Sequence, residues 1–240
     1  MLKKNYRKSI IYVIVIIFSL TISSCKISPP PTPTPTPDLP TTKILSEDPG
    51  SDLPTTKILS EDVGSEITIT KDMLYLEKKR SGLLAPILSL KETKPKIYWF
   101  IVSWLETKYK TPDWTNYGSD TWQKETKKKG IDCSGIARVM HDQVFGYKIM
   151  GSSRYILSKY SKKIALSKAR MGDLVFFKKY KASDEKIIHM GVYLMDNYFV
   201  HATSTRSAKK GLGLNVSPLE GRWKEDLVAV GRVKDEFSTK

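Results

Sequence analysis

The sequence predicts an α+β fold in which N-terminal helices pack on an antiparallel β-sheet. Segments with the apolar spacing of helices come first in the globular part, at 94–110 and 133–146. Segments rich in β-branched and aromatic residues come afterwards, at 173–177, 189–194, 198–203 and 227–233. Helices followed by a run of strands are typical of α+β domains.

The first 24 residues have the layout of a secretion signal. Basic residues near the start are followed by an apolar run from Ile10 to Leu20, and then by small residues that end at Ser24. The run of about 11 residues is well short of the ~20 that a helix needs to cross a bilayer. A permanent membrane span is therefore the weaker alternative.

The next residue is Cys25, and "LTISSC" at 20–25 resembles the lipobox of bacterial lipoproteins. In that motif the cysteine is lipidated and becomes the mature N-terminus. We therefore expect Cys25 to be the lipidation site. Its buried acyl chains would contribute ~0.8 kcal/mol per CH₂ and would hold the protein at a membrane surface. The alternative is that Cys25 is an incidental small residue beside an ordinary cleavage site.

Residues 25–69 are predicted to form the lipidated cysteine and a disordered stalk. "SPPPTPTPTP" at 28–37 favours extended polyproline II, and "DLPTTKILSED" occurs at 38–48 and again at 52–62, a 14-residue repeat. Each copy is polar and holds too few apolar residues for a core. The repeat could instead be a short partner-binding motif. The remainder, 70–240, has the length of one domain with its own core.

The first helical segment, 94–110, places its apolar residues on one face. These are Ile97, Phe100, Ile101, Trp104 and Leu105. Its aromatic side chains are therefore expected in the core rather than in a ligand platform. A turn-rich stretch, "TPDWTNYGSD", follows at 111–120.

The formal net charge of +15 suits anionic partners such as phospholipid head groups or acidic wall polymers. Nucleic acid is not expected, because the protein is exported and its scattered lysines form no aromatic and basic module. The chain has two cysteines, and lipidation of Cys25 would leave Cys133 without a disulfide partner.

The second cysteine, Cys133, lies in "GIDCSGIARVM", at the expected start of the helix 133–146. The first helical turn supplies free N–H groups and a positive dipole end that favour a thiolate. Asp132 is a good N-cap, and the small Ser134-Gly135 pair lets a substrate approach the backbone. This pattern alone is weak, since a lone cysteine near a helix start is more often a buried small hydrophobe.

Two of the three histidines lie in "HMGVYLMDNYFVHAT", residues 189–203. A hairpin with the three-residue loop 195–197 sorts apolar and polar faces cleanly, and it places His201 opposite Gly191 and diagonal to His189. We therefore predict that His189 takes the thiol proton and that His201 orients the ring of His189. The alternative is that both are half-buried histidines of strands.

The motifs "DCSGIARVM", "MGDLVFF" at 171–177 and "HMGVYLMDNYFVHAT", in this order and spacing, resemble the NlpC/P60 cell-wall cysteine peptidases over about residues 95–235. The resemblance implies a papain-like core with Cys133 as nucleophile, His189 as base and His201 as orienting residue. It also implies hydrolysis of peptidoglycan stem peptides, commonly between γ-D-glutamate and a diamino acid, without metal or cofactor.

The resemblance extends to substrate contacts. Tyr117-Gly118 is matched to the family's Tyr-x-Gly-Gly stretch, so Tyr117 is expected near the active site, together with Asp132, Ser134 and Gly191. The expected protein is a monomeric endopeptidase of the cell envelope, anchored to a membrane by its lipid. Two alternatives stay open: a non-catalytic wall-binding lipoprotein that uses the cleft as a tether, and a papain-like acyltransferase that acts on lipids.

Overall fold

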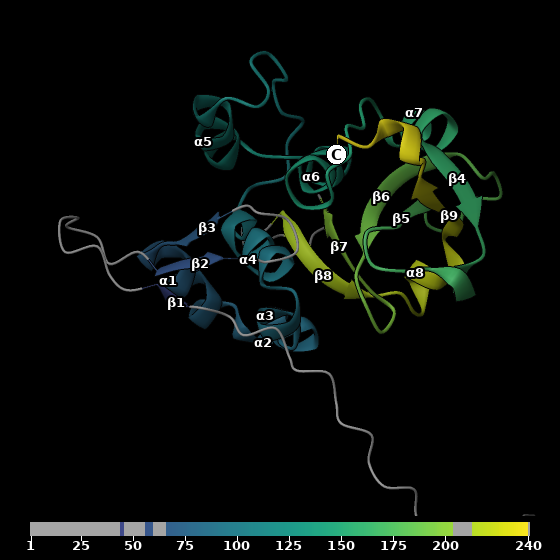
Figure 1. Ribbon diagram of the computed structural model, residues 1–240. Coiled ribbons are helices and arrows are strands. Elements are labelled where there is room, and N and C mark those ends of the chain that lie inside the picture. The colour runs from purple at the N-terminus through teal and green to yellow at the C-terminus, as the bar shows by residue number, and fades with distance from the viewer. Residues whose placement is uncertain (1–43, 46–55, 60–65, 204–212, 240) are drawn as a thin grey trace, which may run out of the picture. The chain divides into compact units, whose positions relative to one another are not determined.

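The computed structural model describes residues 44–45, 56–59, 66–203 and 213–239 (Figure 1). The predicted leader, Cys25 and most of the predicted stalk lie outside these residues. The strands are β1 (Ile44–Leu45), β2 (Thr56–Leu59), β3 (Glu66–Ile69), β4 (Ser161–Ile164), β5 (Leu174–Lys178), β6 (Ile187–Tyr193), β7 (Tyr198–Ala202), β8 (Leu214–Pro218) and β9 (Leu227–Val233).

The helices precede most of these strands. The α-helices are α1 (Lys71–Lys79), α2 (Ser81–Leu84), α3 (Leu90–Thr93), α4 (Pro95–Trp104), α5 (Asp120–Lys129), α6 (Cys133–Met140), α7 (Ser153–Tyr155) and α8 (Arg222–Glu225). Short 3₁₀ and π segments are η1 (Ala85–Ile87), η2 (His141–Phe145), η3 (Ile156–Tyr160), η4 (Leu166–Lys168) and η6 (Asp235–Phe237).

The main sheet has six strands in the order β4-β9-β5-β6-β7-β8, and every neighbouring pair is antiparallel. Helices followed by an antiparallel sheet confirm the predicted α+β class. The four predicted strands correspond to β5, β6, β7 and β9, whereas β4 and β8 were not expected from the sequence. Both lie at the edges of the sheet, where strands are short and their patterns weak.

Helix α6 packs against β6 and β7, and this contact forms the centre of the core (Figure 1). Ile136, Val139 and Met140 on the helix are fully buried, as are Met190 and Val200 on the strands. The predicted helix 133–146 is confirmed as α6 continued by η2, and it ends at Gly146, whose φ of 73° is a left-handed conformation that favours glycine.

The structure differs from the predicted stalk at β1, β2 and β3, which form a three-stranded antiparallel sheet. β1 and β2 hold the same Ile-Leu pair from the two copies of the repeat, and Ile44 lies opposite Ile58. Composition suggested disorder because one copy cannot bury a core, but three paired strands satisfy backbone groups that a single copy leaves free.

The folded domain also begins before the predicted boundary at residue 70. Ile69, the last residue of β3, is only 4% exposed and belongs to the core. Thr70 is the N-cap of α1, and its hydroxyl accepts a hydrogen bond from the backbone N–H of Met73 at 3.3 Å. Residues 66–70 are therefore part of the domain.

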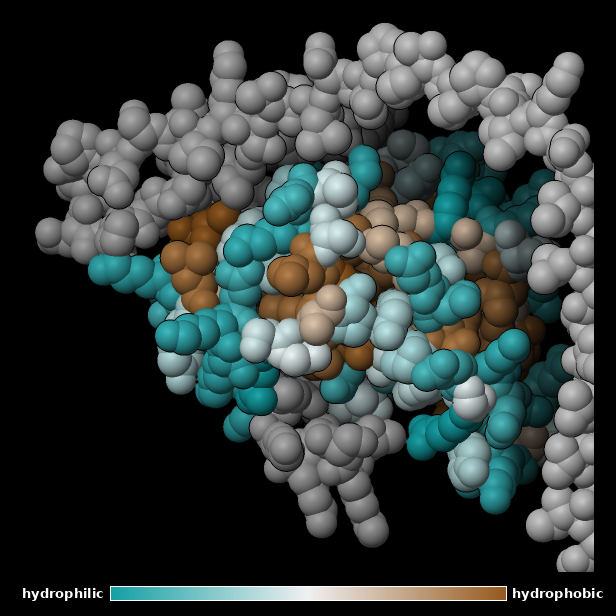
Figure 2. Space-filling view, turned by 90° about the horizontal axis from the view of Figure 1, so that it is seen from below, coloured by the Kyte–Doolittle hydropathy of each residue, from teal (hydrophilic) through white to brown (hydrophobic). Residues whose placement is uncertain are grey.

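Hydrophobic and hydrophilic side chains alternate over the face of the molecule shown in Figure 2. No helix within the described residues is long and apolar enough to span a bilayer.

Candidate active site

Cys133 is the first residue of α6, and its side chain is 7% exposed. Asp132 caps the helix as predicted: its Oδ1 accepts hydrogen bonds from the Gly135 N–H at 2.7 Å and from the Ser134 hydroxyl at 3.0 Å. The cap uses one oxygen of Asp132 internally and fixes the turn that carries the thiol. Asp132 and Ser134 are both half-buried beside Cys133.

The hairpin of β6 and β7 has the register that the sequence predicts. Val192 pairs with Val200, and the Leu194 N–H donates to the Tyr198 carbonyl at 2.8 Å, which leaves the three-residue loop 195–197. His201 therefore lies opposite Gly191. Because this register decides which face each side chain occupies, it brings both histidines to one side of the sheet.

Gly191 makes room between these strands. A Cβ at this position would lie 2.6 Å from Phe199 Cδ2, 2.8 Å from the Val200 carbonyl oxygen and 3.2 Å from His201 Cβ. Gly191 is buried under these groups. Groups of β7 thus fill the space that a side chain at this position would need, and the expected contact of Gly191 with substrate stays a prediction.

His189 and His201 are joined directly, with His189 Nε2 and His201 Nδ1 2.8 Å apart. On its other side, His201 Nε2 lies 3.0 Å from the hydroxyl of Ser217 on β8. Trp223 on α8 packs against both rings, with centroids 5.5 Å from His189 and 4.8 Å from His201. The indole of Trp223 thus covers part of both histidine rings.

Cys133 lies beside Met190, the residue that follows His189 on β6. The backbone N–H of Met190 hydrogen-bonds the sulfur, as do the Ser134 N–H and the hydroxyl of Tyr109. No hydrogen bond joins the sulfur to His189 among the described residues. The thiol is therefore held by backbone and tyrosine, while Nδ1 of His189 is the ring nitrogen that His201 leaves available.

Burial controls the protonation of Cys133 and His189. It raises the pKa of Cys133, and the negative charge of Asp132 raises it further, outweighing the hydrogen bonds that favour the thiolate. Burial lowers the pKa of His189 to about 4, with a smaller contribution from the positive charge of Arg222. The site therefore rests as a neutral thiol and a neutral imidazole, whereas the helix start alone led us to expect a thiolate.

The third histidine, His141, lies outside this site. It is buried, and its ring nitrogens lie 2.9 Å from the Ala137 carbonyl oxygen and 3.0 Å from that of Gly172. Burial lowers its pKa to about 4. His141 therefore ties α6 to the turn before β5, a structural role.

The tyrosine beside the thiol is Tyr109 rather than Tyr117. Tyr109 forms an isolated parallel bridge with Ile131, two residues before Cys133, which places its hydroxyl at the sulfur. Tyr117 instead donates a hydrogen bond to Asp142 Oδ2 at 2.7 Å and packs edge-on against Trp122. The hydroxyl of Tyr117 is therefore bonded to Asp142 and not to the thiol, and the expected contact of Tyr117 with substrate stays a prediction.

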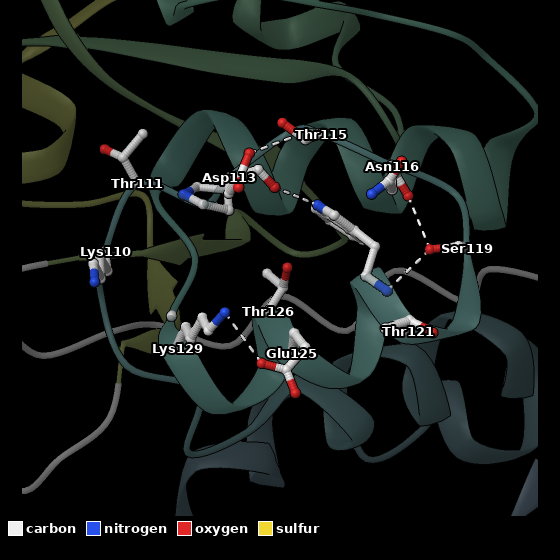
Figure 3. A pocket seen from close by; sticks show the side chains of 13 residues that line it. Lys110, Thr111, Asp113, Thr115, Asn116, Ser119, Thr121, Glu125, Thr126 and Lys129 are labelled. Carbon is white, nitrogen blue, oxygen red and sulfur yellow. Dashed lines mark hydrogen bonds and ion pairs between the residues drawn. The ribbon is translucent and has the colours of Figure 1, made fainter.

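Residues 110–130 leave the domain at Tyr109 and return at Ile131. The neck is closed by hydrogen bonds from the Lys110 N–H to the Ile131 carbonyl at 3.2 Å and from the Ile131 N–H to the Lys108 carbonyl at 2.8 Å. The loop and α5 enclose a cavity of about 550 Å³, seen in Figure 3. Its lining includes Lys110, Asp113, Asn116, Ser119, Trp122, Glu125, Thr126 and Lys129.

The cavity is built from internal contacts. Ser119 caps α5 by accepting from the Trp122 N–H at 3.1 Å, the Trp122 indole donates to the Asp113 carbonyl, and Lys129 pairs with Glu125 at 3.1 Å (Figure 3). The sequence predicted only a turn-rich stretch here. α5 was missed because its apolar face consists of little more than Trp122 and Thr126.

Comparison with known proteins places residues 116–232 in the NlpC/P60 family. The chain is 34% identical over 101 residues to a protein of Haemophilus influenzae named "Probable endopeptidase NlpC homolog", a match that covers 41% of this chain and 46% of that protein. It is 36% identical over 78 residues to the "Murein DD-endopeptidase MepS/Murein LD-carboxypeptidase" of Escherichia coli K12, covering 32% and 39%. The chain thus spans less than half the length of these two relatives.

Two solved structures are similar to part of the chain. An NLP/P60 family lipoprotein-like protein from Staphylococcus aureus is 18% identical with a TM-score of 0.42, covering 68% of this chain and 60% of that one. The NlpC/p60 domain of the peptidoglycan hydrolase SagA is 24% identical with a TM-score of 0.40, covering 58% and 97%. The family match contains Cys133, His189 and His201, and the chain thus carries an NlpC/P60 family domain over residues 116–232.

Proposed function

We propose that this protein is a cysteine endopeptidase that hydrolyses peptide bonds in the stem peptides of peptidoglycan. Cys133 is the nucleophile, His189 the general base and His201 the orienting residue. The observation that carries the proposal is the 2.8 Å contact of His189 Nε2 with His201 Nδ1. This contact leaves Nδ1 of His189 available, and the N–H of the next residue on the same strand, Met190, bonds the thiol. The names of the two relatives, an endopeptidase and a murein endopeptidase, support the same reaction.

The proposed reaction has two halves. Nδ1 of His189 takes the proton of the Cys133 thiol as the sulfur attacks the scissile carbonyl, and the resulting imidazolium returns that proton to the leaving amine. Water then attacks the thioester, giving its proton to His189 and releasing the acid and the free thiol. His201 stabilises the imidazolium by accepting from Nε2 of His189.

Burial makes this general-base route the suitable one. The pKa of His189 is lowered to about 4, so its ring is neutral and able to accept a proton over the whole neutral range. Because burial raises the pKa of Cys133, little thiolate exists before substrate binds. The N–H groups of Met190 and Ser134 then stabilise the sulfur as it develops charge.

The family match and the predicted leader support the proposed substrate and location. The preferred bond is that between γ-D-glutamate and a diamino acid, and the enzyme acts as a monomer in the cell envelope. Cys25 carries the lipid, and the segment up to β1 spaces the domain from the membrane. Cys25→Ala is expected to leave the protein unanchored or unprocessed, which membrane fractionation and the mass of the mature N-terminus test. A normally localised wild-type protein that keeps residues 1–24 would contradict this.

The experiment that tests the activity is digestion of purified peptidoglycan, with mass analysis of the released fragments. Cys133→Ala should release none, and His189→Ala almost none. His201→Ala should retain some activity and His201→Asn more, because an amide oxygen can still accept the N–H of His189. Circular dichroism verifies that each variant is folded. Wild-type rates in folded Cys133→Ala would contradict the proposal.

The same digestion separates the two alternatives. A wall-binding protein would sediment with peptidoglycan without releasing fragments, and its Cys133→Ala variant would bind equally well. An acyltransferase would form a thioester with a lipid acyl donor but would leave stem peptides intact.

A further inference from the structure

Arg138 is a buried cation for which the described part of the chain supplies no oxygen partner. It lies on α6, five residues after Cys133, and is 4% exposed. Its one recorded hydrogen bond runs from Nη2 to the sulfur of Met150 at 3.2 Å, and a thioether is a weak acceptor. Its Nε is buried with no hydrogen-bond partner. Buried charges are normally paired, so this guanidinium requires an explanation.

Aromatic stacking positions the group without satisfying its donors. The guanidinium carbon lies 3.3 Å from the ring centroid of Trp114 and 6.0 Å from that of Tyr117. Stacking uses the flat face of a guanidinium, whereas its N–H bonds point outward in the plane. The stacking therefore leaves Nε without an acceptor and Nη2 with only the Met150 sulfur.

Each of the two neighbouring acids already accepts hydrogen bonds through one of its oxygens. Asp132, whose charge is close enough to act on Arg138, accepts from Gly135 and Ser134. Asp142 accepts from the Tyr117 hydroxyl at 2.7 Å. Neither forms an ion pair with Arg138 among the described residues. The missing acceptor must come from outside this part of the chain.

A cavity adjoins this group. It has a volume of about 190 Å³ and is lined by Tyr117, Gly118, Asp142, Lys148, Ile149 and Met150. Tyr117 and Met150 also contact Arg138, and Met150 is 47% exposed at the rim. Within the lining, the charge of Lys148 balances that of Asp142, and Arg138 behind Tyr117 and Met150 adds a cation without an ion-pair partner among the described residues, so an anion is favoured beside this cavity.

We propose that Arg138, stacked on Trp114 and assisted by Lys148, binds a carboxylate of the substrate peptide away from the scissile bond. This rests on the proposed hydrolysis of stem peptides. Carboxylates match the edge of a guanidinium with two parallel hydrogen bonds. Five residues of helix correspond to about 7.5 Å along its axis and to a turn of about 140° around it, and an extended peptide advances about 3.3–3.6 Å per residue. The carboxylate must therefore lie further from the scissile bond than the roughly two residues that the axial rise alone requires.

The test compares two synthetic stem peptides that differ at one group: a non-scissile carboxylate in the first and its carboxamide in the second. Wild-type protein should cleave the acid with a kcat/KM at least tenfold above that for the amide. Arg138→Gln should bring this ratio close to one, and Arg138→Lys should give an intermediate ratio, because it keeps the charge and loses the planar edge. The matched control is Arg154→Gln, an exposed arginine of α7, which should leave the ratio unchanged.

The ratio of kcat/KM for the acid to that for the amide separates recognition of the carboxylate from a packing defect. A packing defect would lower both values by the same factor and leave the ratio unchanged. If Arg138 variants fail to fold, Lys148→Gln at the exposed rim should still lower the ratio, by about threefold. Equal kcat/KM values for acid and amide in the wild type would overturn the proposal, as would an unchanged ratio in folded Arg138→Gln.

A binding measurement distinguishes failure of this inference from failure of the proposed function. Calorimetric titration of Cys133→Ala with the two peptides should show tighter binding of the acid, a preference that Cys133→Ala/Arg138→Gln loses. If wild-type protein cleaves neither peptide and Cys133→Ala still prefers the acid, the hydrolytic function is wrong and the carboxylate site stands. If cleavage occurs and both peptides bind equally, the carboxylate site is wrong and the function stands.

Discussion

Ser217 Oγ lies 3.0 Å from Nε2 of His201, on the side of the ring away from His189. A neutral imidazole has one N–H, so the direction of this hydrogen bond sets the direction of the next. When His201 Nε2–H donates to Ser217, His201 Nδ1 accepts from His189 Nε2–H, and Nδ1 of His189 is left free as a base. The reverse direction would put a proton on the nitrogen that must accept one from Cys133.

Ser217→Ala is therefore expected to lower kcat/KM for a stem peptide about tenfold, the equivalent of one hydrogen bond of ~1.4 kcal/mol. ¹⁵N spectra of the histidine rings should show a changed tautomer population, a signal that a packing role would not move. Ser158→Ala is the control, since its hydroxyl donates to the Tyr155 carbonyl at the exposed surface. Equal rates for the two variants would contradict the assignment.

The pH dependence of the reaction should reflect the lowered pKa of His189. Protonation removes the base, so kcat/KM should fall on acidification only near pH 4, well below the ordinary histidine pKa of about 6.5. Arg222→Gln removes a positive charge that lowers this pKa, and the acid limb should shift to higher pH. Lys224→Gln on the same helix is the control. An acid limb near pH 6.5 in the wild type would show that His189 is solvated.

Tyr109→Phe should slow alkylation of Cys133 by iodoacetamide at neutral pH about three- to tenfold. The Tyr109 hydroxyl bonds the sulfur and lowers the pKa of the thiol, so its loss raises that pKa and leaves less thiolate at neutral pH. Alkylation rates against pH measure the shift. Tyr117→Phe removes a hydroxyl that bonds Asp142 and should leave the profile unchanged. A larger shift in Tyr117→Phe than in Tyr109→Phe would reverse the assignment of the two tyrosines.

Gly191→Ala should destabilise the fold by about 1–3 kcal/mol, because the added methyl meets a backbone oxygen at 2.8 Å that cannot move without breaking the hairpin. Gly82→Ala is the matched control: nothing lies within 4 Å of a Cβ there, and alanine in a helix gains about 0.5–1 kcal/mol over glycine. Urea unfolding curves measure both free energies. Similar stabilities for the two variants would show that β7 tolerates the methyl group.

The hairpin of β6 and β7 could be predicted from the sequence down to its register. Alternation of apolar residues on both strands allows only one loop length that keeps His189 and His201 on the polar face. The register of such a hairpin depends only on residues close together in the chain, so the sequence alone predicts it. The capped start of α6 was equally accessible, because Asp132 and Gly135 are neighbours in the chain. Both features depend on contacts only a few residues apart.

Tyr109, Ser217 and Trp223 could not be assigned to the site in the same way. Tyr109 reaches Cys133 through a bridge to Ile131, and Ser217 reaches His201 through the edge strand β8. Such contacts depend on which distant segments pair, which the composition of each segment does not encode. The protonation of Cys133 was missed for the same reason, since the burial that raises its pKa comes from strands and loops far along the chain.

The closed neck at Tyr109 and Ile131 makes residues 110–130 a replaceable cassette. Both ends are fixed by main-chain hydrogen bonds, so replacements that keep the packing of Trp122 in the core leave the tyrosine and the helix that bears the thiol in place. Trp114, which positions Arg138, belongs to this cassette. Exchange of the cassette alone could therefore redirect the enzyme to a different cell-wall chemistry while its reactive centre stays the same.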